Sequence, residues 1–361
     1  MLNNFIINFG LVFAVSLLSN LIIVIWFGCR KSKSIKRNDI NAVQASHVKP
    51  VARIGGLSVL IALVLGTIYS ETINSWSSYW LLLLSASPVF IVGFREDLGY
   101  FSSPRIRLLA AVFSSVVFVS LFNVWLLRTD VPGLDFAIQW APLGIGFSIF
   151  LATGINHAFN LIDGLNGLAS FTAIGVALSL AVISHQVELI DHRNILIILS
   201  SAIAGFLLLN FPFGKIFLGD GGAYFIGHIL VWVAISILHA EPNVTPLAML
   251  LIFFYPVADT LLAILRRLHL GAPISQPDRL HFHQLVMRGI EIIVLGRKRR
   301  HIANPLATAF ILPLAFTPMV VGVLLALDRG RATMALLLIT ISFFMAYKCG
   351  MLLTRRFRRS A

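Results

Sequence analysis

Residues 156–184 read NHAFNLIDGLNGLASFTAIGVALSLAVIS, so that a polar stretch leads directly into an apolar run. The run from 167 to 184 is long enough to cross the hydrocarbon core of a bilayer, about 30 Å thick, as a helix. The stretch before it carries three asparagines and one aspartate, and nothing else in the chain is so polar so close to lipid. This juxtaposition indicates a membrane protein with a polar site at the membrane boundary.

If the polar stretch is helical, four of its side chains fall within about 120° of one helix face, at about 100° per residue. They are Asn156, Asn160, Asp163 and Asn166. Carboxylate and amide oxygens are hard ligands, so such a face suits a hydrated metal ion or a nucleotide. The alternative is a polar loop that merely ends a helix.

The composition excludes a soluble globular protein. The chain has 361 residues, 58% of them hydrophobic and 12% charged, and its mean hydropathy is +0.90, whereas about a quarter of the residues in a soluble domain are charged. Long apolar runs without strand alternation favour helices over a barrel. We therefore predict one all-α, multispanning membrane domain over residues 1–361, with eleven spans at 5–27, 54–69, 79–94, 108–127, 141–154, 167–184, 195–212, 223–239, 247–265, 305–327 and 332–352.

Basic residues are distributed unequally between the two sides of these spans. If the N-terminus is outside, one set of loops and the C-terminal tail carry 23 of the 28 Lys and Arg, and the opposite loops carry Arg128, Arg193, Arg329 and Arg331. The positive-inside rule then places the C-terminus in the cytoplasm. Topology explains the net charge of +13, and nucleic acid is not an expected partner because no soluble domain with a basic face remains.

Five polar stretches fall on the predicted cytoplasmic side, which indicates a single site. They are HVKPVARIGG (47–56), REDLGYFSSPRIR (95–107), NHAFNLIDGLNG (156–167), FGKIFLGDGG (213–222) and PDRLHFHQ (277–284). Cys29 and Cys349 lie near opposite ends of the chain and predict neither a disulfide framework nor a cysteine metal site.

Two acidic motifs allow a catalytic and a structural interpretation each. Glu96 and Asp97 are the only adjacent acids, and two close carboxylates in a low-dielectric pocket keep one group basic enough to take a proton. The alternative is that nearby arginines simply neutralise them. Asp220 stands between glycines at the start of a span, where it suits Mg²⁺ or Mn²⁺ with diphosphate oxygens, or else caps the helix.

The C-terminal half adds an intramembrane acid and two histidines. Asp259 lies within a predicted span, where acids are costly and usually functional, although it also suits a supporting role or a pair with Arg266. His281 and His283 share no helix face, but both can point into a site from a loop, and beside Arg279 they suit phosphate oxygens. A transporter with Asp259 and His228 on its path is the alternative from another class of protein.

The ordered motifs PVARIGG (50–56), GFREDL (93–98), NLIDGLNGLA (160–169), FLGDGGAYFIG (217–227), PVADT (256–260) and HFHQ (281–284) resemble those of the polyprenyl-phosphate N-acetylhexosamine-1-phosphate transferases. The resemblance implies an enzyme of the bacterial inner membrane, with its site on the cytoplasmic face. Such an enzyme moves a sugar 1-phosphate from a UDP-N-acetylhexosamine to undecaprenyl phosphate, releases UMP and initiates O-antigen or another envelope glycan. The peptidoglycan branch ranks second, because it usually has aspartate where Asn166 stands and a histidine triplet instead of HFH.

The resemblance also implies roles for residues. It gives Asp220 and Asn160 to Mg²⁺ or Mn²⁺, the acid pair to the lipid phosphate, and Asp163 and Asn166 to the nucleotide. The remaining expected substrate contacts are Lys49, Arg53, Lys215, Arg279, His281 and His283.

Glu96 departs from the usual aspartate, and a longer side chain would misplace a reacting group by about 1 Å. We therefore expect Asp97 to contact the lipid phosphate and Glu96 to tune its charge. The identity of the sugar, a one-step or two-step mechanism, and the oligomeric state, including a homodimer, are left open.

Overall fold

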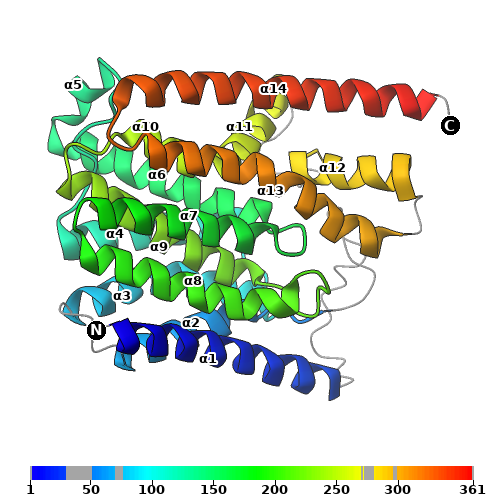
Figure 1. The fold of residues 1–361 in the computed structure, drawn as a ribbon, viewed down its shortest axis with the longest axis horizontal. Helices are drawn as coiled ribbons and strands as arrows, with labels where there is room; N and C mark the ends of the chain where they lie inside the picture. The colour runs from blue at the N-terminus through cyan, green and yellow to red at the C-terminus, as the bar shows by residue number, and fades with distance from the viewer. Residues whose placement is uncertain are drawn as a thin grey trace.

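The computed structural model describes residues 2–29, 51–69, 76–269, 271, 280–295 and 299–359. Within these ranges the chain is helical and forms no β-strand, apart from one isolated bridge. The long helices lie side by side along one direction, with α5 at one end of the bundle and α12 towards the other (Figure 1). The elements are α1 (Leu2–Cys29), α2 (Gly55–Tyr69), α3 (Trp76–Asp97), α4 (Pro104–Phe122), α5 (Leu134–Ile138), α6 (Ala141–Ile162), α7 (Leu168–Gln186), α8 (Ile190–Asn210), α9 (Gly219–Ala240), α10 (Pro246–Ile252), α11 (Phe254–His269), α12 (Phe282–Ile290), the π-helix η2 (Glu291–Leu295), α13 (Arg300–Leu324) and α14 (Arg329–Arg359).

The lengths of the helices confirm a multispanning helical membrane protein. Nine helices in the described ranges are long and apolar enough to cross a bilayer, and α10 with α11 forms a tenth candidate that bends by 81°. The short apolar helix α2 coincides with the remaining predicted span. The orientation of the bundle in the membrane stays a prediction from the charge distribution.

Several helix ends differ from the limits of the predicted spans, among them those of α4, α6, α8 and α14. Helix α4 ends at Phe122 because Asn123 adopts a left-handed conformation, with φ of 54°, and donates its N–H to the Val119 carbonyl. Helix α6 continues eight residues beyond 154, to Ile162, and thereby includes Asn156 and Asn160.

The predicted single helix face from Asn156 to Asn166 is wrong. Asp163 already caps the end of α6, and the chain turns before α7 begins at Leu168. The turn ends at Gly167, whose φ of 79° favours glycine. Asn156 and Asn160 therefore lie on a helix, whereas Asp163 and Asn166 lie on a turn.

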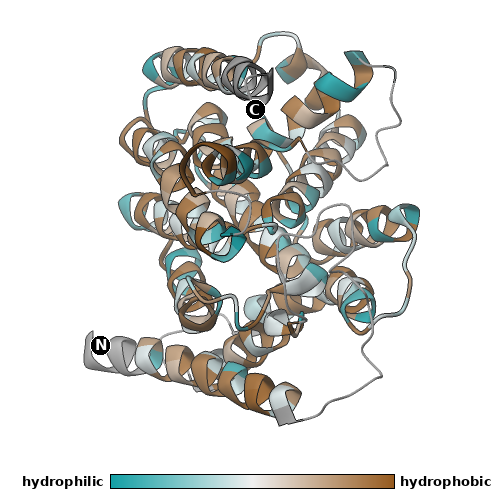
Figure 2. Cartoon of the chain, turned by 90° about the vertical axis from the view of Figure 1, so that its right-hand side faces the viewer, coloured by the Kyte–Doolittle hydropathy of each residue, from teal (hydrophilic) through white to brown (hydrophobic). Residues whose placement is uncertain are grey.

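Helix α9 forms the axis of the bundle and packs chiefly against α3 and α6. In its most apolar segment of 18 residues, 94% of the residues are buried, compared with 17% in the corresponding segment of α1 and 11% in that of α14. Glycines allow the closest approaches: a Cβ at Gly56 would lie 2.2 Å from the Gly222 Cα, and one at Gly93 would lie 2.6 Å from the Gly221 Cα. Figure 2 views the helices nearly end-on and shows how much of their ribbon is apolar.

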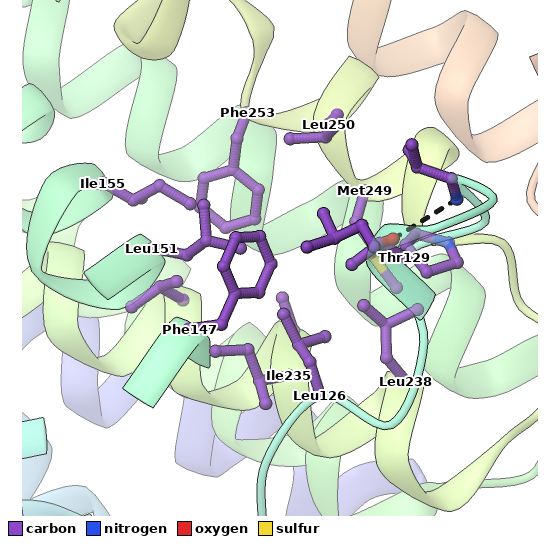
Figure 3. A pocket seen from close by; sticks show the side chains of 15 residues that line it. Leu126, Thr129, Phe147, Leu151, Ile155, Ile235, Leu238, Met249, Leu250 and Phe253 are labelled. Atoms are coloured by element: carbon purple, nitrogen blue, oxygen red, sulfur yellow. Dashed lines mark hydrogen bonds between the residues drawn. The ribbon is translucent and has the colours of Figure 1, made fainter. Parts of the chain in front are cut away.

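An apolar pocket of about 160 Å³ lies between α6, α9 and the bend after α10 (Figure 3). Phe147, Leu151, Ile235 and Phe253 are among the side chains that line it. Ile235 follows Asp220 by fifteen residues, which is about 22 Å along a helix. This part of the pocket therefore lies well away from Asp220, whereas Ile155, which also lines the pocket, directly precedes Asn156 of the polar stretch.

Candidate active site

The acid pair at the end of α3 meets the start of α9. The two carboxylate oxygens of Asp97 accept the backbone N–H groups of Asp220 and Gly221, each at 2.9 Å. These donors belong to the first turn of α9, where no intrahelical acceptor exists and where a negative charge is favourable. Asp97, whose side chain is 2% exposed, thus caps α9 from another helix.

Two arginines connect the acids into a chain of alternating charge. Arg107 places Nη1 3.2 Å from Asp220 Oδ2 and 3.3 Å from Glu96 Oε2. Arg53 places Nη2 3.2 Å from Asp220 Oδ1 and Nε 3.9 Å from Asp97 Oδ1. Buried carboxylates are tolerated when they are paired in this way. The arrangement leaves cationic groups on both sides of Asp220.

A short parallel bridge between Ala52 and Ile216 positions Arg53. The Phe217 N–H donates to the Ala52 carbonyl at 2.8 Å, and the Gly55 N–H donates to the Phe217 carbonyl at 2.9 Å. Two motifs more than 160 residues apart therefore lie side by side.

Gly219 makes the closest of these contacts possible. A Cβ at Gly219 would lie 2.0 Å from the Arg53 carbonyl oxygen, and its φ is 80°. Both facts require glycine at this position.

Asp163 joins the cluster from the end of α6. Burial and the nearby charge of Asp220 raise the pKa of Asp163 to about 8, although Arg53 and a hydrogen bond from the Gly219 backbone lower it. Two carboxylates that repel each other in this way are a donor set that a divalent cation stabilises. Asn160 precedes Asp163 by three residues, in the last turn of α6, and its role as a metal ligand stays a prediction.

The two histidines of HFHQ converge on Asp259. Asp259 Oδ2 lies 3.0 Å from His283 Nδ1 and 3.4 Å from His281 Nδ1, and its Oδ1 accepts the Phe282 N–H at 2.7 Å. Asp259, His281 and His283, which we call the histidine cluster, all have buried side chains. Each offers one atom that could bind a metal ion, and these three atoms lie within 4.8 Å of one another. Asp259 was expected either to support neighbouring groups or to pair with Arg266. The structure shows the supporting role, because Asp259 holds the two histidines. Arg266 Nη1 instead donates to the Leu280 carbonyl.

The histidine cluster borders the turn that follows Asp163. A Cβ at Gly164 would lie 2.8 Å from His283 Nε2. With Nδ1 directed at Asp259, the His283 ring presents Nε2 to this turn. His281 and His283 were expected on a loop, but His281 is the N-cap of α12 and His283 lies in its first turn, so the start of α12 is brought to the end of α6.

Asn166 is buried and forms three hydrogen bonds to two other segments. Its backbone N–H donates to Asn304 Oδ1 at 2.8 Å, its carbonyl accepts the Thr308 hydroxyl at 2.8 Å, and its Nδ2 donates to the Pro212 carbonyl at 3.0 Å. These bonds fix the turn against α13, and a role in nucleotide binding stays a prediction.

The structure gives little information on the other basic side chains that were expected to contact substrate. Lys215 is exposed, with Nζ 5.2 Å from the centre of the Phe213 ring. Lys49 and Arg279 lie outside the described residues.

Sequence reasoning did not single out two residues that the structure brings to the site. Asn210 accepts the Gly167 N–H at 2.6 Å and donates to the Ile216 carbonyl at 2.8 Å, so it connects two motif turns. His157 contacts Tyr224 edge-on, with ring centroids 5.0 Å apart. Its position inside NHAFNLIDGLNG was the available signal for His157, whereas Asn210 was marked only by its polarity at the end of an apolar run.

Comparison with known proteins adds a consistent pattern. The sequence model of glycosyl transferase family 4 matches residues 79–238, a range that contains Glu96, Asp97, Asp163 and Asp220. A probable undecaprenyl-phosphate N-acetylglucosaminyl 1-phosphate transferase of Bacillus subtilis (strain 168) is 30% identical over 299 residues, which cover 80% of this chain and 79% of that protein.

Two further relatives share the same region at lower identity or coverage. The undecaprenyl-phosphate alpha-N-acetylglucosaminyl 1-phosphate transferase of Escherichia coli O157:H7 is 26% identical over 281 residues, 73% of this chain and 72% of the relative. A phospho-N-acetylmuramoyl-pentapeptide-transferase of Staphylococcus carnosus (strain TM300) is 29% identical over 256 residues, 66% of this chain and 78% of the relative.

Proposed function

Because this chain belongs to glycosyl transferase family 4 and is a glycosyl-1-phosphate transferase, we propose that it moves an N-acetylhexosamine 1-phosphate from a UDP-sugar to undecaprenyl phosphate and releases UMP. The product is a lipid diphosphate sugar that initiates O-antigen or another envelope glycan. The observation that carries the proposal is the chain of charges Arg53–Asp220–Arg107–Glu96. Its arginines lie at the end of a membrane-spanning bundle, where each could exchange the Asp220 carboxylate for a substrate phosphate.

We place the reaction at the cytoplasmic face of the bacterial inner membrane. The distribution of Lys and Arg, 23 against 4, supports this side. A nucleotide sugar is a soluble anion of the cytoplasm, and the lipid phosphate reaches the same end of the bundle from the bilayer.

Arg53 and Arg107 bind phosphoryl oxygens in this proposal. Both arginines hold Asp220 in the described structure, at 3.2 Å each. When the donor diphosphate binds, its oxygens compete for the guanidinium groups and the Asp220 carboxylate is released for a cation. Arginine suits this exchange, since its planar group binds carboxylate and phosphate alike.

Asp220 and Asn160 would hold Mg²⁺ or Mn²⁺, with the Asp163 carboxylate beside them. The raised pKa of Asp163, caused by burial and by Asp220, supports the fit of a cation to this donor set. When bound, the ion would neutralise charge that develops on the leaving UMP. Asp163 and Asn166 then border the nucleotide, and the histidine cluster lies where the donor's phosphates would pass.

The geometry favours a division of the acid pair opposite to the one expected from sequence. Both oxygens of Asp97 already accept backbone N–H groups of α9, so Asp97 positions Asp220. Glu96 contacts Arg107, a side chain that can be redirected towards a phosphate. We assign the contact with the attacking lipid phosphate to Glu96.

The peptidoglycan enzyme is the second candidate, because the Staphylococcus carnosus relative carries that name. It shares the reaction type and differs in the donor sugar. Transport is set aside by membership in a transferase family.

One assay separates the candidates. Purified protein in detergent receives undecaprenyl phosphate, Mg²⁺ and a panel of labelled donors: UDP-GlcNAc, UDP-GalNAc, a 6-deoxy analogue and UDP-MurNAc-pentapeptide. Release of UMP that depends on both the lipid and the metal supports the proposal, and the preferred donor identifies the branch. UMP release with none of the donors would refute it, and an Asp220→Asn variant controls for contaminating hydrolases.

A further inference from the structure

His157 lies on α6 between the polar motifs and the membrane interior. It precedes Asp163 by six residues, about 9 Å along a helix, and belongs to the span Ala141–Ile162. Its ring contacts Tyr224, which follows Asp220 by four residues and therefore lies one turn deeper on the same face of α9. Asp220 is paired with Arg107, so the His157 ring lies about one turn deeper than this ion pair.

The Nε2 atom of this histidine is buried and, within the part of the chain that the structure describes, has no hydrogen-bond partner. Buried polar atoms without partners are uncommon and need a specific reason. His228, eight residues beyond Asp220 on α9, has its Nε2 3.0 Å from Ser85 Oγ, whereas its Nδ1 is also buried without a partner in the described ranges. His157 differs from His228 in its neighbour, because its ring contacts Tyr224, one turn from Asp220.

The chemistry of the surroundings selects the missing partner. A phosphoryl oxygen accepts hydrogen bonds, and Arg107, which pairs with Asp220 one turn before Tyr224, supplies a cation in the same cluster. The position of His157 along α6 indicates where the phosphate comes from. His157 lies on the membrane side of the Arg107–Asp220 pair. The turn at Asp163 and the histidine cluster lie beyond the end of α6. A lipid phosphate arrives from the former side and a soluble nucleotide from the latter.

We propose that His157 is a further substrate-contacting residue, which donates a hydrogen bond from Nε2–H to a phosphoryl oxygen of the polyprenyl phosphate acceptor. The inference rests on the proposed function, since it names a contact of the same reaction. It adds a membrane-side wall, formed by His157 and Tyr224, to the charged cluster.

The test compares His157→Ala and His157→Gln with wild type and with His228→Gln, a matched control in the same buried core. The KM values for undecaprenyl phosphate and for the donor are measured separately with the metal present. His157→Ala is expected to raise the acceptor KM by about tenfold or more, the effect of one lost hydrogen bond to a charged group. His157→Gln recovers part of the loss through its amide N–H, and His228→Gln leaves both KM values near those of wild type.

Binding of undecaprenyl phosphate alone, followed by the shift in thermal unfolding temperature, gives a readout without turnover. Weaker binding by folded His157→Ala supports the inference even if wild type turns over none of the donors, an outcome that refutes the proposed function instead. Unchanged lipid binding and an unchanged acceptor KM in His157→Ala would overturn the inference. A rise in the donor KM alone would also overturn it, because the contact would then belong to the nucleotide sugar.

Discussion

Two buried aspartates, Asp130 and Asp220, lie at opposite ends of the bundle and differ in the groups that neutralise their charges. At the end near α5, Asp130 accepts the Thr245 hydroxyl and lies 3.6 Å from Arg128, whose Nη2 donates to the Val244 carbonyl at 2.6 Å. The Asp130 carbonyl accepts from Arg329 Nη2 at 2.8 Å. These bonds join the segment before α5 to the starts of α10 and α14.

At the other end, Asp220 is held by two long arginine side chains, and polar atoms such as His157 Nε2 and Asn156 Oδ1 have no partner within the described ranges. The Asp130 carboxylate also faces two arginines, Arg128 at 3.6 Å and Arg329 at 4.0 Å, but both of these donate to backbone carbonyls of the fold. Around Asp220, the arginine side chains and the polar atoms without partners can still form hydrogen bonds with a ligand. Buried charge alone therefore does not mark a site, whereas buried charge with exchangeable partners does.

The largest expected effect is that of Asp220→Asn. The change keeps the shape of the side chain but removes the charge that would hold the cation, so turnover should fall by about three orders of magnitude or more. UMP release with saturating donor, lipid and Mg²⁺ measures the effect. If folded Asp220→Asn keeps near-normal, metal-dependent turnover, Asp220 is only a helix cap, and the functional contrast between Asp220 and Asp130 is refuted.

The acid pair should separate activity from stability. We expect Glu96→Gln to lower kcat by about a hundredfold, the range of one acid–base or phosphate-orienting group, while its unfolding temperature stays close to that of wild type. Asp97→Asn loses an acceptor for the first turn of α9 and should lower the unfolding temperature as well as kcat. Parallel turnover and thermal unfolding measurements check both variants. An active Glu96→Gln together with a fully stable, inactive Asp97→Asn would restore the division expected from sequence.

A smaller effect is expected at the histidine cluster. Asp259→Asn should raise the donor KM by about tenfold, because His283 loses the hydrogen bond that orients Nε2 towards Gly164. The double variant Asp259→Asn, His283→Ala should be no worse than His283→Ala alone, since the two residues act as one unit. Additive losses would show that Asp259 acts independently of the histidine. The acceptor KM serves as the internal control.

The smallest effect on turnover is expected for Asp130→Asn. Its carboxylate bonds lie within the fold, so the free energy of unfolding should fall by about 1–3 kcal/mol. The values of kcat and both KM should stay within about twofold of wild type. Thermal or denaturant unfolding and the UMP assay measure the two halves of this prediction. A large loss of turnover without loss of stability would mean that the end near α5 also takes part in the reaction.

Hydropathy and motif order predicted much of this molecule, because both depend on local sequence. The predicted spans overlap helices, although the run from 247 to 265 is divided between α10 and α11 and the run from 108 to 127 ends at Phe122. The acid pair, Asp163 and Asp220 come together as the one-sided motifs indicated. Sequence left the stretch up to Gly167 open between a helix face and a polar loop, and periodicity alone could not place the turn that the structure has at Gly164–Gly167. The contact between Asp259 and the histidines was not specified either, because it depends on the direction that the chain takes after the 81° bend between α10 and α11. Arg107 was considered as a partner of the acid pair, but its bond with Asp220 joins residues 113 positions apart.

The glycine contacts along α9 determine how the protein should respond to bilayer thickness. The spacing between α2, α3 and α9 at the charged cluster is set by backbone atoms, since Gly56 meets Gly222 and Gly93 meets Gly221 without intervening side chains. The outer helices α1 and α14 are the least buried of the candidate spans, with 17% and 11% of the residues in their most apolar segments buried. A thicker or thinner membrane is therefore expected to change the tilt of these two helices, while the distances among Arg53, Arg107 and Asp220 stay constant.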